Sequence, residues 1–392
     1  MTTEYDVIVA GAGMMGSAAA RHLAATGRKV ALVGPSEPAD NADHTGVFAS
    51  HYDEARITRR IDTNVDWSKL ATESIRRYGE IERQSGQAFY HEVGCLMAGA
   101  GDGPESDFVK NCLTVCDRND IPHERLIGPA LTERFPFFSF PDAVTGLFQA
   151  RDAGYVNPRA LVAAQKAAAE SLGADVIDQE VTAIDERADS VTVRCQDGTV
   201  LRGQRVVVSC GAFSDAAGLL PAPLNLRNYA RTIALVEVGR EESERLKGMP
   251  SLIYVSPDQR IDVYVLPPVL YPDGKTYLKI GGDPVDVVLP TVDALKTWFR
   301  GNGDPAVRDL LVDQLLTIMP TLRYESISFK SCATSYTRIK QPAIAHQSDR
   351  IVALCGGNGS AAKSSDEIGR IGAALVSGDP DYAAGYGLDF KP

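Results

Sequence analysis

The pattern of hydrophobic and polar positions near the start of the chain predicts a strand, a glycine turn and a helix in succession. Residues Val7 to Ala10 form a short apolar run typical of a buried strand, and Met15 to Thr26 carries apolar residues at helical spacing. Arg28 to Val33 has the pattern of a second strand. Between the first strand and the helix lies Gly11-Ala12-Gly13-Met14-Met15-Gly16, and in this context such glycines are typical of dinucleotide binding.

Each glycine of this Gly-x-Gly-x-x-Gly motif has its own expected task. Gly11 makes the tight turn, Gly13 lets a pyrophosphate approach the backbone, and Gly16 lets the helix pack closely on the strand. The helix N-terminus adds unpaired N–H groups and a partial positive charge for the phosphates. The motif and its neighbour Met15 therefore predict a cofactor site.

The end of the second strand departs from the usual dinucleotide pattern. An acidic residue normally stands there to bind ribose hydroxyls, but this chain has Gly34. A hydrogen bond to a charged group is worth about 1.5–3 kcal/mol, so its loss weakens binding without abolishing it. Ser36 or Glu37 is a possible substitute, and the alternative is that both are simply loop residues.

Further along, the pattern predicts alternating helices and strands. Helices are expected at Val65–Ser85, ending at Gly86, and at Asn157–Leu172, where Asn and Pro mark the start. Other expected elements are strands at Ala174–Ile177, Val191–Cys195, Arg205–Cys210, Lys275–Gly282 and Ile351–Cys355, and helices at Ala306–Met319 and Ser364–Val376. The region from Asn225 to Pro320 is otherwise expected to consist of strands.

Composition narrows the class of protein. The chain has 392 residues, 44% of them hydrophobic, which is enough for a large core and two domains. Its net charge of −11 argues against nucleic acid and anionic membranes as main partners. No apolar run approaches the ~18–20 residues of a membrane span, and the N-terminus lacks the pattern of a signal peptide. We therefore expect a cytoplasmic protein.

The seven cysteines are scattered along the chain, which favours free thiols in a reducing compartment over a disulfide framework. Cys112 and Cys116 share one face of a possible helix and are expected to be packing residues. They lack the second ligand pair that a metal centre requires. We predict no metal site.

A basic segment follows the first two strands. Ser50-His51-Tyr52-Asp53-Glu54-Ala55-Arg56-Ile57-Thr58-Arg59-Arg60 holds three arginines within five residues of an acidic protein. The simplest interpretation is a solvated basic face that pairs with local Asp and Glu residues. A second glycine-rich turn, Gly356-Gly357-Asn358-Gly359, precedes the last predicted helix and is able to direct backbone N–H groups at a cofactor.

The order of these segments resembles the flavin-dependent amine oxidases of the D-amino-acid oxidase superfamily, most closely monomeric sarcosine oxidase and the fructosyl-amino-acid oxidases. The resemblance rests on the glycine motif, the S-H-x-x-x-x-R-x-x-R segment, the L-K-x-G segment around Lys279 and the G-x-x-G-x-x-x-K segment ending at Lys363. It implies FAD as the cofactor, and it spans nearly the whole chain.

The resemblance also implies roles for individual residues. Ser50, His51 and Arg56 are expected at the flavin ring, with Arg59 and Lys363 binding the substrate carboxylate. Lys279 is expected over the flavin, where it promotes the reduction of O2, although a strand lysine by itself is most often exposed to solvent. Further expected positions are Tyr264 at the substrate, Val181 near the adenine, Gly211 near the pyrophosphate, and Gly357, Gly359 and Lys363 beside the flavin.

Cys332 is the candidate for a covalent flavin link, which is common in this family. The family's cysteine lies two residues before a Tyr-Thr pair, whereas Cys332 lies four residues before Tyr336-Thr337, with Thr334 in the expected place. A shift of two residues moves a strand side chain by about 6–7 Å. We therefore expect FAD to be bound without a covalent link. Asp283 stands in place of a family histidine.

Together these features predict an α/β protein with a discontinuous, Rossmann-like FAD-binding domain and an α+β substrate domain with a mixed or antiparallel sheet. The expected division assigns residues 1–90, 151–222 and 331–392 to the FAD-binding domain, and 91–150 and 223–330 to the substrate domain. The resemblance implies oxidation of the C–N bond of a secondary or N-substituted amino acid by a monomer or small homo-oligomer. The imine is then hydrolysed, and O2 is reduced to H2O2.

Three alternatives remain open at this point. A flavin dehydrogenase with another electron acceptor needs the same sites. An NAD(P)-dependent dehydrogenase uses the N-terminal motif alone, but leaves the basic segment and the second glycine turn unexplained. A flavin- or ligand-binding protein without catalytic activity fits the departures at Gly34, Asp283 and Cys332.

Overall fold

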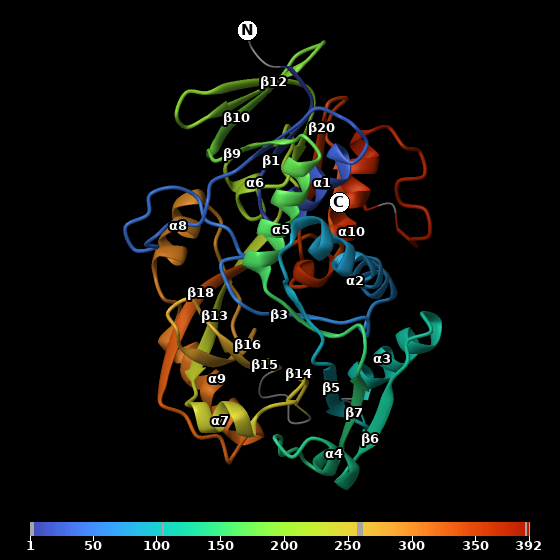
Figure 1. Cartoon of the computed structure of the whole chain (residues 1–392), viewed down its shortest axis with the longest axis vertical. Coiled ribbons are helices and arrows are strands. Elements are labelled where there is room, and N and C mark those ends of the chain that lie inside the picture. The colour runs from blue at the N-terminus through green and yellow to red at the C-terminus, as the bar shows by residue number, and fades with distance from the viewer. Residues whose placement is uncertain (1–3, 104–105, 257–261, 389, 392) are drawn as a thin grey trace.

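The computed structural model of the chain describes residues 4–103, 106–256, 262–388 and 390–391, and two large sheets dominate it. Figure 1 shows one sheet with its helices in the upper half and the other in the lower half. This mixed α/β architecture confirms the predicted fold class.

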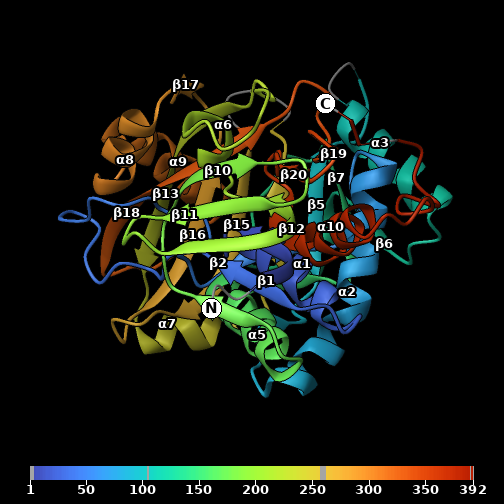
Figure 2. The ribbon, with the colours of Figure 1, turned by 90° about the horizontal axis from the view of Figure 1, so that it is seen from above.

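The upper sheet has eight strands in the order β10-β11-β12-β1-β2-β9, with β20 beside β12 and β19 beside β20. Strands β9, β2, β1, β12 and β20 run parallel, while β10, β11 and β19 are antiparallel additions. Seen from above in Figure 2, β10, β11 and β12 follow one another in this order. Their bounds are β1 (Glu4–Ala10), β2 (Val30–Val33), β9 (Asp175–Ile177), β10 (Val181–Glu186), β11 (Val191–Cys195), β12 (Val200–Val208), β19 (Ala343–His346) and β20 (Ile351–Cys355).

Helices pack beside this sheet because their small and apolar faces meet the valines and leucines of the strands. Alanines of α1, such as Ala19 and Ala20, share a buried cluster with Val9 and Leu32 of the sheet and Ile368 of α10. The helices of this half are α1 (Met14–Ala24), α2 (Val65–Ser85), α5 (Pro158–Ser171), α6 (Phe213–Ala216) and α10 (Ala361–Val376).

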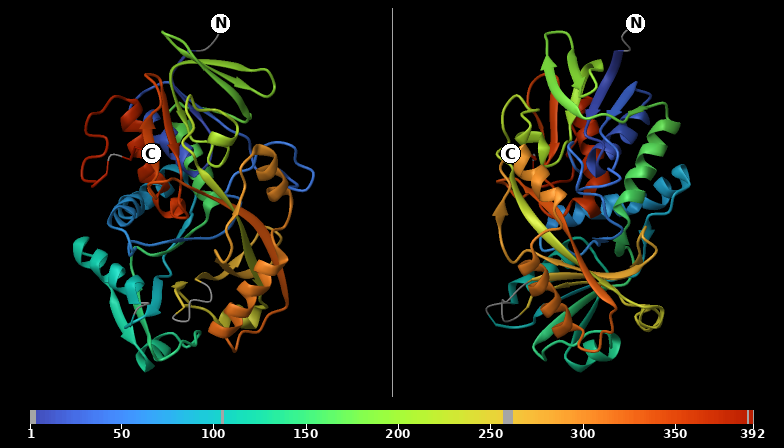
Figure 3. Two further views of the ribbon diagram at one scale, coloured as in Figure 1. Left: turned by 180° about the vertical axis from the view of Figure 1, so that it is seen from behind. Right: turned by 90° about the vertical axis from the view of Figure 1, so that its left-hand side faces the viewer.

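The lower sheet has nine strands and is mixed: β14 and β5 are parallel, and the other pairs are antiparallel. Its long strands β13 and β18 form a curved ribbon along one side of the molecule (Figure 3). The bounds are β5 (Cys95–Ala100), β6 (Glu124–Ile127), β7 (Val144–Gln149), β13 (Arg227–Glu237), β14 (Ser251–Tyr254), β15 (Val263–Leu270), β16 (Thr276–Gly282), β17 (Val287–Val288) and β18 (Ser326–Tyr336).

A third, three-stranded sheet, in the order β3-β8-β4, contains residues Arg56–Thr58 of the basic segment. The remaining elements are β3 (Arg56–Thr58), β4 (Tyr90–His91), β8 (Gly154–Val156), α3 (Asp107–Arg118), α4 (Pro129–Arg134), α7 (Arg240–Arg245), α8 (Val292–Arg300) and α9 (Pro305–Ile318). Apolar residues of α9 pack on the nine-stranded sheet in the largest buried cluster.

The capping signals place several helices as predicted. Asn64 accepts hydrogen bonds from two backbone N–H groups at the start of α2, and Gly86 ends that helix with a φ of 68°. The side chain of Asn157 accepts one such bond, from the backbone N–H of Ala160, at the start of α5. Cys112 and Cys116 lie buried on α3, as expected.

Two predictions were wrong in detail. The last helix begins at Ala361 rather than Ser364, so Lys363 lies in its first turn. The region from Asn225 to Pro320 contains α7 and α8 in addition to the expected helix. Among the described residues, no helix has both the length and the apolar composition needed to cross a bilayer.

Candidate active site

The glycine turn after β1 is sterically fixed. Gly11 has a φ of +106°, and a Cβ there would lie 2.3 Å from the backbone oxygen of Ser209. A Cβ on Gly16 would lie 1.8 Å from the backbone oxygen of Gly11. Gly13 has open space instead, since its nearest neighbour in that direction is Nδ1 of His51 at 3.9 Å. The turn is therefore tight on its inner side and open at Gly13.

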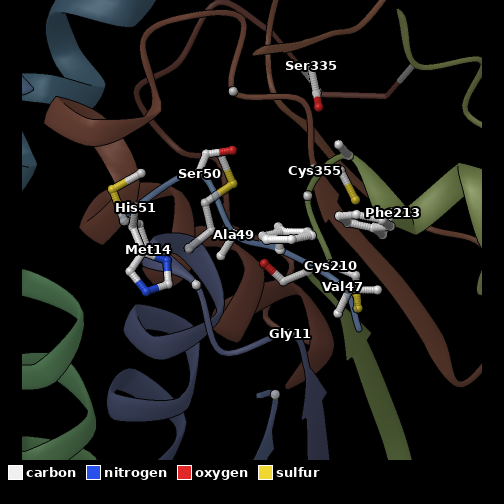
Figure 4. Close-up of a pocket in the computed structure, with 18 of the residues that line it drawn as sticks. Gly11, Met14, Val47, Ala49, Ser50, His51, Cys210, Phe213, Ser335 and Cys355 are labelled. Carbon is white, nitrogen blue, oxygen red and sulfur yellow. The ribbon is translucent and has the colours of Figure 1, made fainter. Parts of the chain in front are cut away.

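This open side faces a cavity whose lining includes residues of both halves of the molecule, and Figure 4 shows part of it. Gly13 precedes α1 without a side-chain cap, and Ser360 precedes α10 without one, so both helix N-termini keep free N–H groups. The cavity is lined by all of the predicted cofactor residues except Gly16 and Lys363, namely Gly11, Gly13, Met15, Ser50, His51, Arg56, Val181, Gly211, Gly357 and Gly359.

The residues that line the cavity fit a dinucleotide. The glycines leave room at the backbone where a Cβ would otherwise stand, and two helix N-termini offer free donors to phosphate oxygens. The walls are mostly apolar, as a flavin and an adenine require. An FAD molecule is therefore compatible with the shape and the chemistry of this cavity.

The position after the second strand has a steric explanation. A Cβ on Gly34 would lie 2.5 Å from the backbone nitrogen of Ala12, so a larger residue does not fit. Ser36 is hydrogen-bonded to Asp178, Glu37 pairs with Arg159, and neither lines the cavity. The geometry therefore favours the interpretation of Ser36 and Glu37 as loop residues.

Glu180 is the one carboxylate among the residues that line the cavity. It accepts a hydrogen bond of 3.0 Å from the backbone N–H of Val47. Sequence reasoning missed Glu180, although it directly precedes Val181, which was expected near the adenine. That neighbouring position is the signal that would have found it.

Beside the cavity, the basic segment forms a first ion cluster around Asp53. Lys279 of β16 donates to Oδ2 of Asp53 at 2.5 Å and to the backbone oxygen of Ala55 at 2.6 Å. Arg56 pairs with the same carboxylate at 3.1 Å, and the Tyr271 hydroxyl donates to it at 2.9 Å. Lys279 is 1% exposed, so it is not the solvent-facing lysine that a strand position alone suggests.

Burial and charge oppose each other in this cluster. Burial by itself raises the pKa of Asp53, but the charges of Lys279 and Arg56 outweigh it and lower that pKa well below its usual range. Burial lowers the pKa of Lys279 to about 8, against the opposing influence of Asp53. Between the two pKa values, Asp53 is ionised and Lys279 is protonated.

A second cluster surrounds Asp62. Its Oδ2 lies 3.1 Å from Nη1 of Arg59 and 3.0 Å from Nζ of Lys363, which also donates to the backbone oxygen of Trp67 at 3.2 Å. Burial lowers the pKa of Lys363 to about 8. The structure thus brings together the two cations predicted at the substrate carboxylate, with an aspartate between them that sequence reasoning missed.

The structure supports only one part of the simplest interpretation of the basic segment, the pairing with local acidic residues. Its arginines do pair with local aspartates, since Asp53 is three residues before Arg56 and Asp62 is three residues after Arg59. These pairs are buried rather than solvated on a basic face. Arg56 lines the cavity, whereas Arg59, Asp62 and Lys363 are not among the residues that line it. Only the third arginine, Arg60, pairs with a half-exposed partner, Asp152.

Other predicted residues lie next to these clusters. The ring of Tyr264 lies 5.6 Å from Nζ of Lys279, and burial raises the pKa of its hydroxyl. Sγ of Cys332 accepts a 3.5 Å hydrogen bond from Arg56. Cys332 is not among the residues that line the cavity, whereas the three residues that follow it in β18 are. Asp283 pairs with Arg231 at 2.9 Å.

Within the described part of the chain, no three His, Cys, Asp or Glu side chains gather in a way that would hold a metal ion. All seven cysteines are free thiols.

Comparisons with known proteins agree with this geometry. A protein of Streptomyces avermitilis, monomeric sarcosine oxidase, is 33% identical over 210 residues, or 53% of this chain and 52% of that protein. N-methyl-L-tryptophan oxidase of Yersinia pestis is 26% identical over 54% of each chain. The matched part of the chain spans about half the length of these curated relatives.

Solved structures share the fold over the whole chain. The open form of NikD, described as an unusual amino acid oxidase essential for nikkomycin biosynthesis, has a TM-score of 0.78 at 22% identity. The alignment covers 100% of this chain and 98% of that one. The model of the family of FAD-dependent oxidoreductases matches residues 6–375. This match confirms the resemblance and rules out the alternative of an NAD(P)-dependent dehydrogenase, so the chain belongs to the family of FAD-dependent oxidoreductases.

Proposed function

We propose that this enzyme oxidises the C–N bond of a secondary or N-substituted amino acid and passes the electrons to O2, producing H2O2. The observation that carries the proposal is the pair of buried ion clusters, each with an arginine and a lysine around one aspartate. The first of them lines the cavity through Arg56. The names of two relatives, sarcosine oxidase and N-methyl-L-tryptophan oxidase, denote oxidases of N-methylated amino acids and support the same class of substrate.

FAD, when bound, supplies the two-electron acceptor that takes a hydride equivalent from the carbon next to the amine. We propose that Gly11, Gly13 and the N-terminus of α1 hold its pyrophosphate, with Gly211 nearby. Val181 lies on the adenine side, and Ser50, His51, Gly357 and Gly359 lie beside the ring. Because Cys332 does not line the cavity, we propose that the cofactor is bound without a covalent link.

In this proposal, the second cluster, around Asp62, binds the substrate. Arg59 and Lys363 attract the acidic end of the substrate, and the buried Tyr264 lies at the side of the first cluster. The amine has to be uncharged before it gives up a hydride equivalent. The oxidised substrate is an imine, which water hydrolyses to a carbonyl compound and an amine.

Lys279 and Arg56 are the catalytic residues of the proposal. A fixed cation in a site without water stabilises the negative charge that develops on O2 as it is reduced. Lys279 is held by two acceptors, Asp53 and the backbone oxygen of Ala55, so its ammonium group needs no rearrangement during the reaction.

We also propose that the domain division expected from the sequence applies to this structure. All strands of the eight-stranded sheet lie in the segments 1–90, 151–222 and 331–392, and all strands of the nine-stranded sheet except β18 lie wholly in 91–150 and 223–330. Strand β18 (Ser326–Tyr336) crosses the proposed boundary at residue 330. Separate cooperative unfolding of the two halves would support this division.

The purified protein tests the proposed function directly. We expect a yellow protein whose flavin absorbance bleaches when an N-methylated amino acid is added without oxygen, and returns on exposure to air with one H2O2 per flavin. Bleaching without return in air would instead identify a dehydrogenase with another acceptor. After acid precipitation, a yellow supernatant is expected, and a yellow pellet would contradict the non-covalent proposal.

We expect Glu180→Gln to weaken FAD binding. We propose that Glu180 binds ribose hydroxyls in place of the acid missing at Gly34, since it is the one carboxylate lining the cavity. A hydrogen bond to a charged group is worth about 1.5–3 kcal/mol, so the Kd for FAD should rise about tenfold or more. Glutamine still accepts the hydrogen bond from Val47.

The fluorescence of FAD released on dilution measures this change. Glu170→Gln on the exposed side of α5 removes the same charge away from the cavity and serves as the control. Equal release from both variants would exclude a ribose contact for Glu180.

A further inference from the structure

Asp62 lies between the two cations that are proposed to bind the substrate's acidic group. One of its oxygens, Oδ2, is 3.1 Å from Nη1 of Arg59 and 3.0 Å from Nζ of Lys363. The other oxygen accepts the backbone N–H of Asn64 at 3.1 Å. Asp62 therefore already holds the bridging position that a substrate carboxylate would take between these cations.

The charges of the cluster follow from this arrangement. Two cations and one carboxylate leave one net positive charge where Arg59 and Lys363 alone would leave two. The side chains of Asp62 and Lys363 are 9% and 4% exposed, so solvent and salt screen the pairing very little. The attraction that the cluster exerts on a further carboxylate is correspondingly reduced.

The N–H donors of Lys363 and Arg59 that lack an acceptor indicate how the cluster contacts a ligand. Asp62 and the backbone oxygen of Trp67 take up two of the three N–H groups of Lys363. Nε of Arg59, in contrast, is buried and has no hydrogen-bond partner among the described residues. A buried donor without a partner is costly, and one carbonyl oxygen of a ligand is enough to satisfy it. Carboxylates, amides and esters all carry such an oxygen.

We infer that Asp62 is a specificity-determining residue that makes this site accept N-substituted amino acids with either a free or an amidated carboxyl group. This inference rests on the proposed function and deepens it by naming the substrate class. Arg59 then contacts the carbonyl oxygen common to both forms, while Asp62 neutralises Lys363.

Two isosteric ligands that cannot be oxidised at nitrogen test the inference on the flavin-loaded protein. Methoxyacetate and methoxyacetamide have the shape of N-methylglycine and its amide, with an ether oxygen in place of the amine. Their Kd values are measured from the change in the flavin absorption spectrum. The wild type should prefer the acid over the amide by less than about tenfold, since one net charge remains. A larger preference for the acid would overturn the inference.

The second part of the experiment uses the variant Asp62→Ala, which lacks the carboxylate between the two cations. Removing this carboxylate leaves the buried cations Arg59 and Lys363 without a counter-ion. A bound ligand carboxylate reduces the free-energy cost of these unpaired charges. Methoxyacetate should therefore bind Asp62→Ala at least about tenfold more tightly than the wild type and raise its thermal unfolding temperature more, whereas methoxyacetamide should not. Unchanged affinity of the variant for methoxyacetate would overturn the inference. If neither ligand binds the wild type, the measurements on Asp62→Ala alone test the inference.

Asp152→Ala is the matched control, since Asp152 pairs with the neighbouring Arg60 but is half exposed. It should leave the preference between acid and amide unchanged. If Asp62→Ala fails to bind flavin, Asp62→Asn keeps the side-chain shape and should shift the preference in the same direction. Failure of the proposed function would look different, because no amine would then bleach the flavin whatever the ligand preference.

Discussion

Replacing Lys279 with methionine is expected to slow the reaction of the reduced enzyme with O2 by about 10²–10³-fold, the usual loss when one preorganised charge at a reacting centre is removed. Methionine keeps the length of the side chain but removes the cation that Asp53 and the backbone oxygen of Ala55 hold in place. Bleaching of the flavin by substrate in the absence of O2 should change much less. Stopped-flow absorbance measures the two half-reactions separately.

The wild type should also show a pH dependence that the variant lacks. The pKa of Lys279 is lowered by burial to about 8, so the ammonium form is present below this pH and is lost as the pH rises through it. The rate with O2 should fall over that range in the wild type and stay flat in Lys279→Met. Lys275→Met, at an exposed lysine four residues earlier that pairs with Glu237, is the control. An O2 rate within twofold of the wild type would exclude a catalytic role for Lys279.

Asp366→Asn is expected to lower the free energy of unfolding by about 3–5 kcal/mol, the cost of removing one partner from a buried ionic network. Asp366 is fully buried in α10 and accepts from Arg21 of α1 at 2.8 Å, Arg77 of α2 at 2.5 Å and Gln165 of α5 at 2.8 Å. The variant leaves two arginines without this charge. Chemical unfolding followed by tryptophan fluorescence measures the loss.

A surface pair provides the comparison. Asp185 and Arg194 lie 3.0 Å apart with both side chains about half exposed, and Asp185→Asn should cost less than about 1 kcal/mol. The partners of Asp366 hold its pKa well below the usual range even though burial opposes them. Its stabilisation is therefore present above the unfolded-state pKa near 3.9 and lost as the pH falls below it. A difference of less than 1 kcal/mol between Asp366→Asn and wild type at neutral pH would contradict this account.

Elements with local signals could be predicted from the sequence. Asn157-Pro158 indicates the start of α5, and Gly86 indicates the end of α2. Both signals are local because capping depends on residues within one helical turn. The short helix α8 was not predicted, although the side chain of Thr291 caps it by accepting a hydrogen bond from the backbone N–H of Ala294. In a region that otherwise alternates as strands do, a single capping residue is a weak signal.

The ion clusters could be predicted only in part. The resemblance to a family identified Arg56, Arg59, Lys279 and Lys363, because short motifs preserve them. The aspartates at the centre of each cluster were not identified: each lies three residues from its arginine, but its lysine is distant in the sequence. Asp53 and Lys279 are 226 residues apart, and nothing local to either residue indicates the other. Glu180 was missed for the same reason, since the cavity that it lines is formed by the fold.

The order of strands in the eight-stranded sheet also constrains how the enzyme is made in the cell. Strand β1, near the N-terminus, pairs with β12, and β12 pairs with β20, which ends at Cys355. The cavity wall likewise extends from Gly11 to Ala362. A ribosome must therefore synthesise the chain through Ala362 before every residue that lines the cavity is present. We therefore expect flavin loading to come late in biogenesis, because a nascent chain that stops before β20 lacks part of the cavity wall.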